Sequence, residues 1–96
     1  MTDKQEAAIG QIVRHYTCDQ QMYAAVIECA EFIQAVCKCK QGKKGAFENL
    51  KEEIADVLIM AEQMRQYIDA DSVDQIINRK LYSQLDRIMA EGRTKT

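Results

Sequence analysis

Four carboxylates stand at matched spacing in two apolar segments of the chain. Glu28 and Glu31 lie within "VIECAEFIQAV", and Glu53 and Asp56 lie within "KEEIADVLIMAEQM". Residues three apart share one face of a helix, so each pair presents two carboxylates on the same side. A carboxylate removed from water without a partner costs several kcal/mol or shifts its pKa. A bound cation is therefore the expected compensation.

The two acidic pairs are placed symmetrically about Gly42. Glu28 and Asp56 are equally far from this glycine, and so are Glu31 and Glu53. If the two segments form an antiparallel hairpin about Gly42, all four carboxylates face one another, and they cannot all stay ionised without counter-charge. Carboxylate oxygens without histidine or thiolate suit a hard cation, Mg²⁺ or Mn²⁺.

Other interpretations of these acids are weaker. E-x-x-E and E-x-x-D pairs are common on solvated helices, but the apolar surroundings of Glu53 and the matched register favour a metal site. A di-iron carboxylate bundle needs Glu-x-x-His on two helices, and His15 is the only histidine. The four cysteines form no C-x-x-C pair and are expected to be free thiols rather than zinc ligands.

Hydrophobic periodicity predicts four helices and no strands. Their expected ranges are Asp3–His15, Gln20–Lys40, Phe47–Ile68 and Ser72 to near Gly92. Asp19 is expected to cap the second helix, and Ser72 with Gln75 forms a predicted capping box for the fourth. "QGKKGAF" is a loop signal because it places two glycines among lysines. The predicted fold class is all-α, an antiparallel helical bundle of about four helices per chain.

The two central helices carry apolar arcs that are too wide for a single partner. The arc of the second helix is centred on residues such as Val26 and Ile33, and that of the third on residues such as Ile54 and Leu58. Phe32 and Met60 lie away from these centres and are candidate interface residues. The bundle is therefore expected to be completed by homo-oligomerisation.

Size and composition set broad limits. The 96 residues suit one domain, 1–96, and the absence of proline together with 47% hydrophobic residues suits uninterrupted helices. A net charge of −2 gives no bulk attraction to nucleic acid or to acidic lipid. The sequence shows neither a membrane-length apolar run nor the apolar core of a signal peptide. A cytoplasmic location is expected, with neither nucleic acid nor a membrane as a partner.

The motifs "ECAE" and "EIAD", with "NLKEEIADVLIMAEQM" and "KLYSQLDRI", resemble the MazG-like all-α nucleoside triphosphate pyrophosphohydrolases of the short phage and bacterial type. The resemblance covers a core of about 20–90. It implies Mg²⁺-dependent cleavage of a (d)NTP to a (d)NMP and pyrophosphate, as nucleotide-pool house-cleaning, by a homodimer or homotetramer. It assigns Glu28, Glu31, Glu53 and Asp56 as metal ligands and catalytic residues. Family members often begin the motif with two adjacent acids, whereas Ile27 precedes Glu28 here.

The fourth helix offers candidate substrate-binding residues. Lys80 and Arg87 are seven residues apart on one flank and can offset charge on the leaving pyrophosphate, although solvated surface charge is an equal alternative. Asn78 lies near the border of the apolar arc and can hydrogen-bond a base or sugar.

Two other classes of function stay open at this point. One is a non-catalytic helical module that binds a nucleotide or a protein through a decayed site, which Ile27 favours. The other is a purely structural bundle, in which the four acids have no ligand.

Overall fold

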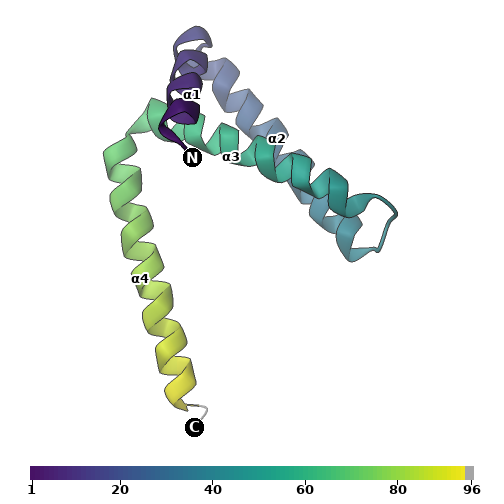
Figure 1. Ribbon diagram of the computed structural model, residues 1–96, viewed down its shortest axis with the longest axis vertical. Helices are drawn as coiled ribbons and strands as arrows, with labels where there is room; N and C mark the ends of the chain where they lie inside the picture. Colours follow the sequence, from purple (N-terminus) through teal and green to yellow (C-terminus); the bar gives the residue numbers. More distant parts are fainter. Residues whose placement is uncertain (95–96) are drawn as a thin grey trace.

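The computed structural model describes residues 1–94, which form four helices and no strand. These are α1 (Asp3–His15), α2 (Cys18–Lys40), α3 (Ala46–Ile68) and α4 (Ala70–Thr94). The predicted all-α class is confirmed. In Figure 1, α2 and α3 form a helical hairpin, α1 packs against α3, and α4 leaves the end of α3 as an arm. None of the helices within 1–94 is both long enough and apolar enough to cross a membrane.

The start of α2 differs from the prediction. Thr17 is the N-cap: its hydroxyl accepts the N–H of Gln20, and the Gln20 side chain accepts the N–H of Thr17. This reciprocal pair satisfies two donors that the helix leaves free. The expectation that Asp19 caps this helix is wrong, because the helix has already begun and Asp19 lies in its first turn.

A single extended residue, Asp69, separates α3 from α4. Its carboxylate accepts both the N–H and the hydroxyl of Ser72, and these bonds lower the pKa of Asp69. The predicted Ser72–Gln75 capping box is wrong, because the helix starts at Ala70 and Asp69 provides the cap. Arg65 stabilises the joint by donating to Asp74 at 2.7 Å and to Glu62 at 2.6 Å.

The loop between α2 and α3 depends on two glycines. Gly42 and Gly45 have φ angles of 70° and 75°, in the left-handed region that side chains other than glycine rarely adopt. These turns reverse the chain within five residues, so α3 returns along α2 (Figure 1).

The contact between α2 and α3 follows an alternating spacing of three and four residues. The positions that are buried or half-buried along this seam are 21, 25, 28, 32, 35 and 39 on α2, and 46, 50, 53, 57, 60 and 64 on α3. Ala35 is 1% exposed and Met60 is 8% exposed. Such spacing keeps one stripe of each helix against the other.

The apolar arc of α2 identified from periodicity points away from this seam, as do Ile54 and Leu58 of α3, whereas Leu50, Val57 and Met64 of the predicted α3 arc lie in the seam. Val26 is 66% exposed and Ile33 is 61% exposed, whereas Met60 lies inside the hairpin. The expectation that Met60 is an interface residue is therefore wrong, and Phe32 is half-buried at the seam. On α2 the contact uses a flank that carries small and polar residues, which leaves Val26 and Ile33 outside, whereas α3 contributes larger apolar side chains such as Val57 and Met60.

Ala35→Leu should destabilise the hairpin, because α3 leaves no room for a larger side chain there. We expect the free energy of unfolding to fall by about 1–3 kcal/mol, measured by urea denaturation. Ala7→Leu, at an exposed position of α1, is the matched control and should change it by less than about 0.5 kcal/mol. An equal effect of the two substitutions would contradict this packing.

Candidate metal centre

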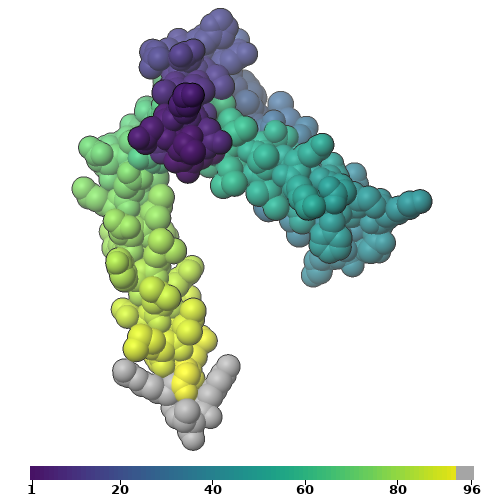
Figure 2. Space-filling model, viewed as in Figure 1, coloured from purple at the N-terminus to yellow at the C-terminus, as the bar shows by residue number. Residues whose placement is uncertain are grey.

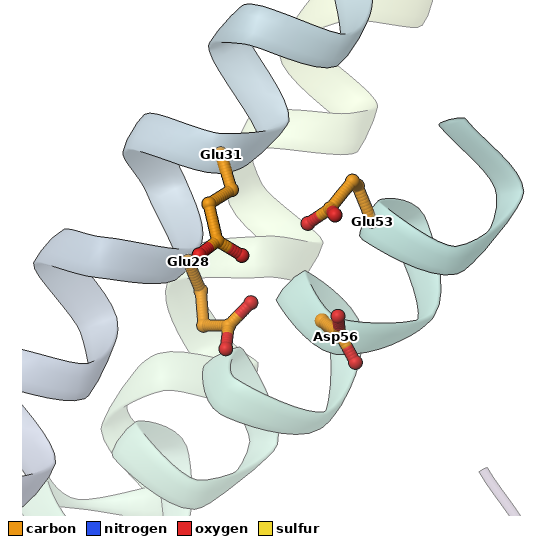
Figure 3. A group of neighbouring side chains, drawn as sticks. All are labelled: Glu28, Glu31, Glu53 and Asp56. Carbon is orange, nitrogen blue, oxygen red and sulfur yellow. The ribbon is translucent and has the colours of Figure 1, made fainter. Parts of the chain in front are cut away.

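The hairpin brings the four acidic side chains of the two motifs into one cluster. Figure 3 shows Glu28 and Glu31 projecting from α2 toward Glu53 and Asp56 on α3. One carboxylate oxygen from each residue lies within 4.8 Å of the others. The juxtaposition predicted from the spacing about Gly42 is therefore present in the structure.

Two of the four acids occupy seam positions. Glu28 and Glu53 are half-buried where a helical hairpin normally places apolar side chains, whereas Glu31 and Asp56 lie at the exposed edge. Ala35, two turns along the seam from Glu28, keeps the two helices close. Backbone packing thus holds the carboxylates together, although their charges repel.

The electrostatics of the cluster penalise ionisation. Burial raises the pKa of Glu28, and the charges of Asp56 and Glu31 raise it further. Burial is also the largest cause of the raised pKa of Glu53, with added contributions from its three acidic neighbours and from a hydrogen bond to Glu31. A group of carboxylates in this state gains from any cation that enters it.

The cluster has unused ligand atoms. Glu28 Oε2 and Glu53 Oε2 are buried and accept no hydrogen bond. Within the described part of the chain, the recorded ion pairs join Lys51 to Glu48 and Arg65 to Glu62 and Asp74, so none neutralises the cluster. An all-oxygen donor set with two orphaned buried oxygens fits a hard divalent cation such as Mg²⁺.

Ile27 does not take part in this arrangement. Its side chain is 54% exposed and lies outside the seam positions. The four carboxylates therefore converge without any contribution from position 27.

The structure does not bring the predicted substrate-binding residues to the cluster within one chain. Asn78, Lys80 and Arg87 are exposed on α4, which runs away from the hairpin (Figure 1). If Lys80 and Arg87 bind phosphate at the cluster, they must therefore come from another copy of the chain.

Sequence reasoning missed two amide side chains near the acids. Gln21 and Gln63 line pockets beside the cluster, and they too are equally far from Gly42. Their equal distance from Gly42 could have indicated that the two amides lie opposite each other. Uncharged amides are common on solvated helices, however, so their residue type does not indicate burial.

Comparison of the sequence with protein-family models gives no match, and comparisons with curated proteins and with solved structures give none either. The assignment to a family stays a prediction from the motifs.

The raised pKa values predict how stability depends on pH without divalent cations. The folded state takes up protons at a higher pH than the unfolded state, whose glutamates titrate near 4.5. Stability should therefore fall as pH rises above about 4.5 through the raised pKa values, with the full loss above them. Thermal unfolding in EDTA should show a higher Tm near pH 5 than near pH 7.5, and Mg²⁺ should reduce this difference.

Glu53→Gln tests whether the carboxylate cluster causes this pH dependence of stability. The variant should have a higher Tm than the parent at neutral pH in EDTA, because it removes a half-buried charge, and it should lose most of the stabilisation by Mg²⁺. Glu52→Gln changes an exposed neighbouring acid and should do neither. Equal responses of the two variants to Mg²⁺ would contradict a metal centre at the cluster.

Proposed function

We propose that the chain is a Mg²⁺-dependent nucleoside triphosphate pyrophosphohydrolase that acts on the nucleotide pool. The observation that carries this proposal is the cluster of four carboxylates within 4.8 Å, two of which have buried oxygens without a partner. Such a site fits the divalent cations that accompany triphosphates. The resemblance of "ECAE" and "EIAD" to the MazG-like motifs supplies the reaction class.

In this reaction a water oxygen bonds to the α-phosphorus, and the bond from that phosphorus to the α–β bridging oxygen breaks. Glu28, Glu31, Glu53 and Asp56 would hold Mg²⁺, which would supply charge neutralisation and lower the pKa of the attacking water. A carboxylate of the cluster accepts the proton of that water. The electron pair leaves with pyrophosphate, so cationic side chains must face the leaving group.

A second copy of the chain is the proposed source of those cations. The chain exposes 7748 Å², about 2,100 Å² more than the roughly 5,600 Å² expected for a compact monomer of 11.0 kDa. An excess of this size is on the scale of an obligate homodimer interface. Figure 2 shows the arm standing clear of the hairpin over most of its length.

The arm itself has the character of an interface. Leu81 and Leu85 are each 54% exposed, and they continue a stripe that includes Ile77 and Ile88. In the dimer these side chains meet the outward apolar faces of the other copy. Because Lys80 and Arg87 share this arm, assembly is the step that can bring them to the other chain's carboxylates.

A binding module with a decayed site is the alternative function. Ile27, in place of the first of the two adjacent acids found in many family members, is the observation that favours it. The intact cluster of four acids favours hydrolysis, and measurement of turnover separates the two functions.

Pyrophosphate release from a panel of canonical and modified (d)NTPs tests the activity. At least one nucleotide should be cleaved to its monophosphate with Mg²⁺, and Glu53→Gln should lower kcat/KM by about 100-fold or more, since even indirect partners of metal sites contribute 10–100-fold. Glu52→Gln is the control and should retain activity. No turnover with Mg²⁺ or Mn²⁺ across the panel would refute the enzyme, and binding without turnover would select the module.

Mixing two inactive variants tests the shared site. One chain carries Glu53→Gln, and the other carries Lys80→Ala with Arg87→Ala. After denaturation and refolding together, half of the dimers are mixed and each mixed dimer has one intact site, so about one quarter of the parent activity should return. If activity does not return although mixed dimers form, the arm does not serve the other chain's carboxylates.

A further inference from the structure

An apolar groove of about 490 Å³ lies between α1 and α3. Its border is made mostly of alanine, isoleucine and leucine side chains from both helices, among them Ala8, Ile9, Ile12, Ala55, Leu58 and Ile59. The two alanines leave space between larger neighbours, and Leu58 and Ile59 are 56% and 40% exposed. Hollowed apolar surface that a chain leaves in water marks an interaction site.

The arm α4 presents an apolar ridge of matching kind. The ridge consists of side chains at spacings of four, four and three residues, which place them on one side of the helix: Ile77, Leu81, Leu85 and Ile88. All four are exposed, from 46% at Ile77 to 62% at Ile88. Amphipathic helices bind apolar grooves through anchors at such spacings. The arm therefore offers the kind of surface that the groove accepts.

The arm is held away from the groove of its own chain. Asp69 alone separates α3 from α4, and Arg65 on α3 donates two hydrogen bonds of 2.7 Å to the carboxylate of Asp74 on α4. This bidentate pair fixes the direction in which the arm leaves the hairpin. Figure 2 shows the arm clear of the hairpin over most of its length. Folding it back would break that pair, so the accessible groove is that of another molecule.

The two flanks of the ridge carry different side chains. Lys80 and Arg87 each directly precede a residue of the ridge, so both lie about 100° around the helix on the same side of it. Tyr82 and Met89 each directly follow a residue of the ridge and lie on the opposite side. The ridge is therefore basic along one flank and aromatic or apolar along the other.

The groove shares one wall with the carboxylate cluster. Ile59 borders the groove and also a pocket of about 120 Å³ that is lined by Glu28 and Asp56. Asp56 directly follows Ala55, so it lies about 100° around α3 from the groove. For one of the two directions that a helix can take in the groove, the basic flank faces this wall. Charge complementarity favours that direction.

We propose that the groove between α1 and α3 binds the α4 arm of a second copy of the chain, and that each copy gives its arm to the other. The exchange covers both apolar surfaces at once, as suits a chain that exposes about 2,100 Å² more than a compact monomer of its mass. Pairing of the two arms with each other would leave the groove in water. The delivery of Lys80 and Arg87 to the other chain's carboxylates rests on the proposed function, whereas the docking of the arm does not.

Matched substitutions in α1 test the docking. Ala7 and Ala8 are neighbouring exposed alanines, and of the two it is Ala8 that borders the groove. In sedimentation equilibrium, Ala8→Glu should raise the Kd of the dimer at least about tenfold, because it buries a carboxylate under the arm. Ala7→Glu should keep the Kd within about threefold of the parent value. Equal Kd values for the two variants, or a monomeric parent chain, would overturn the proposal.

A photocrosslinker on the arm identifies what the arm contacts. Benzoylphenylalanine replaces Leu85 on the ridge in one sample and Arg79, on the opposite side of the arm, in the control. Unlabelled and ¹⁵N-labelled chains are refolded together and irradiated, so that crosslinks between copies are recognised by mass. Crosslinks from position 85 should join two copies and end in α1 or at residues 55–59, and position 79 should give few. Crosslinks from position 85 to the other arm, to the outward face of α2, or within a single chain would overturn the proposal.

These two measurements use no nucleotide, so they separate the docking from the proposed function. If no nucleotide is cleaved but Ala8→Glu weakens the dimer and the crosslinks end in the groove, the enzyme proposal fails and the docking stands. If nucleotides are cleaved but Ala8→Glu dimerises like Ala7→Glu, the docking fails and the enzyme proposal stands. If both proposals hold, the specific activity of Ala8→Glu should fall on dilution at concentrations where Ala7→Glu stays fully active.

Discussion

The structure depends on the placement of two like charges inside the contact between two helices. Glu28 and Glu53 take positions that a helical hairpin normally fills with apolar side chains. Their neighbours along the seam, such as Ala35 and Met60, are well buried and hold the backbones together. The hairpin therefore cannot relieve the repulsion by separating, and what can change is the charge, through protonation or through a bound cation.

The same constraint explains why so much apolar surface lies outside. Because α2 contributes mostly small and polar residues to the seam, its large side chains such as Val26 and Ile33 point outward, and Leu58 of α3 is exposed as well. The arm adds a second unpartnered stripe. A chain of this size with few fully buried side chains has little hydrophobic stabilisation of its own. In our proposal the exposed apolar surface forms an interface with a second copy, and that interface also completes the site.

Much of the fold could be predicted from the sequence, and the errors have identifiable physical causes. The bounds of α1, the ends of α2 and α3, and the alignment of the acids about Gly42 were predictable because local periodicity and a short glycine loop determine them. Periodicity pointed to the wrong packing face of α2, since it ranks faces by apolar content, whereas on α3 the predicted face includes the seam residues Leu50, Val57 and Met64. The two predicted caps, Asp19 and Ser72, were wrong because other capping residues, Thr17 and Asp69, lie two or three residues earlier and start each helix first.

The candidate site also has a part that could be predicted from the sequence and a part that could not. Carboxylates in apolar segments are visible in a sequence because their burial is costly, so all four acids could be identified. An amide in a helix is ordinary until its neighbours are known, and only the packing of α1 against the hairpin shows that Gln21 is enclosed with a free oxygen. Yet Gln21 and Gln63 share the spacing about Gly42 that relates the acids. In a hairpin whose seam repeats every seven residues, polar pairs that obey one register lie at successive levels along that seam.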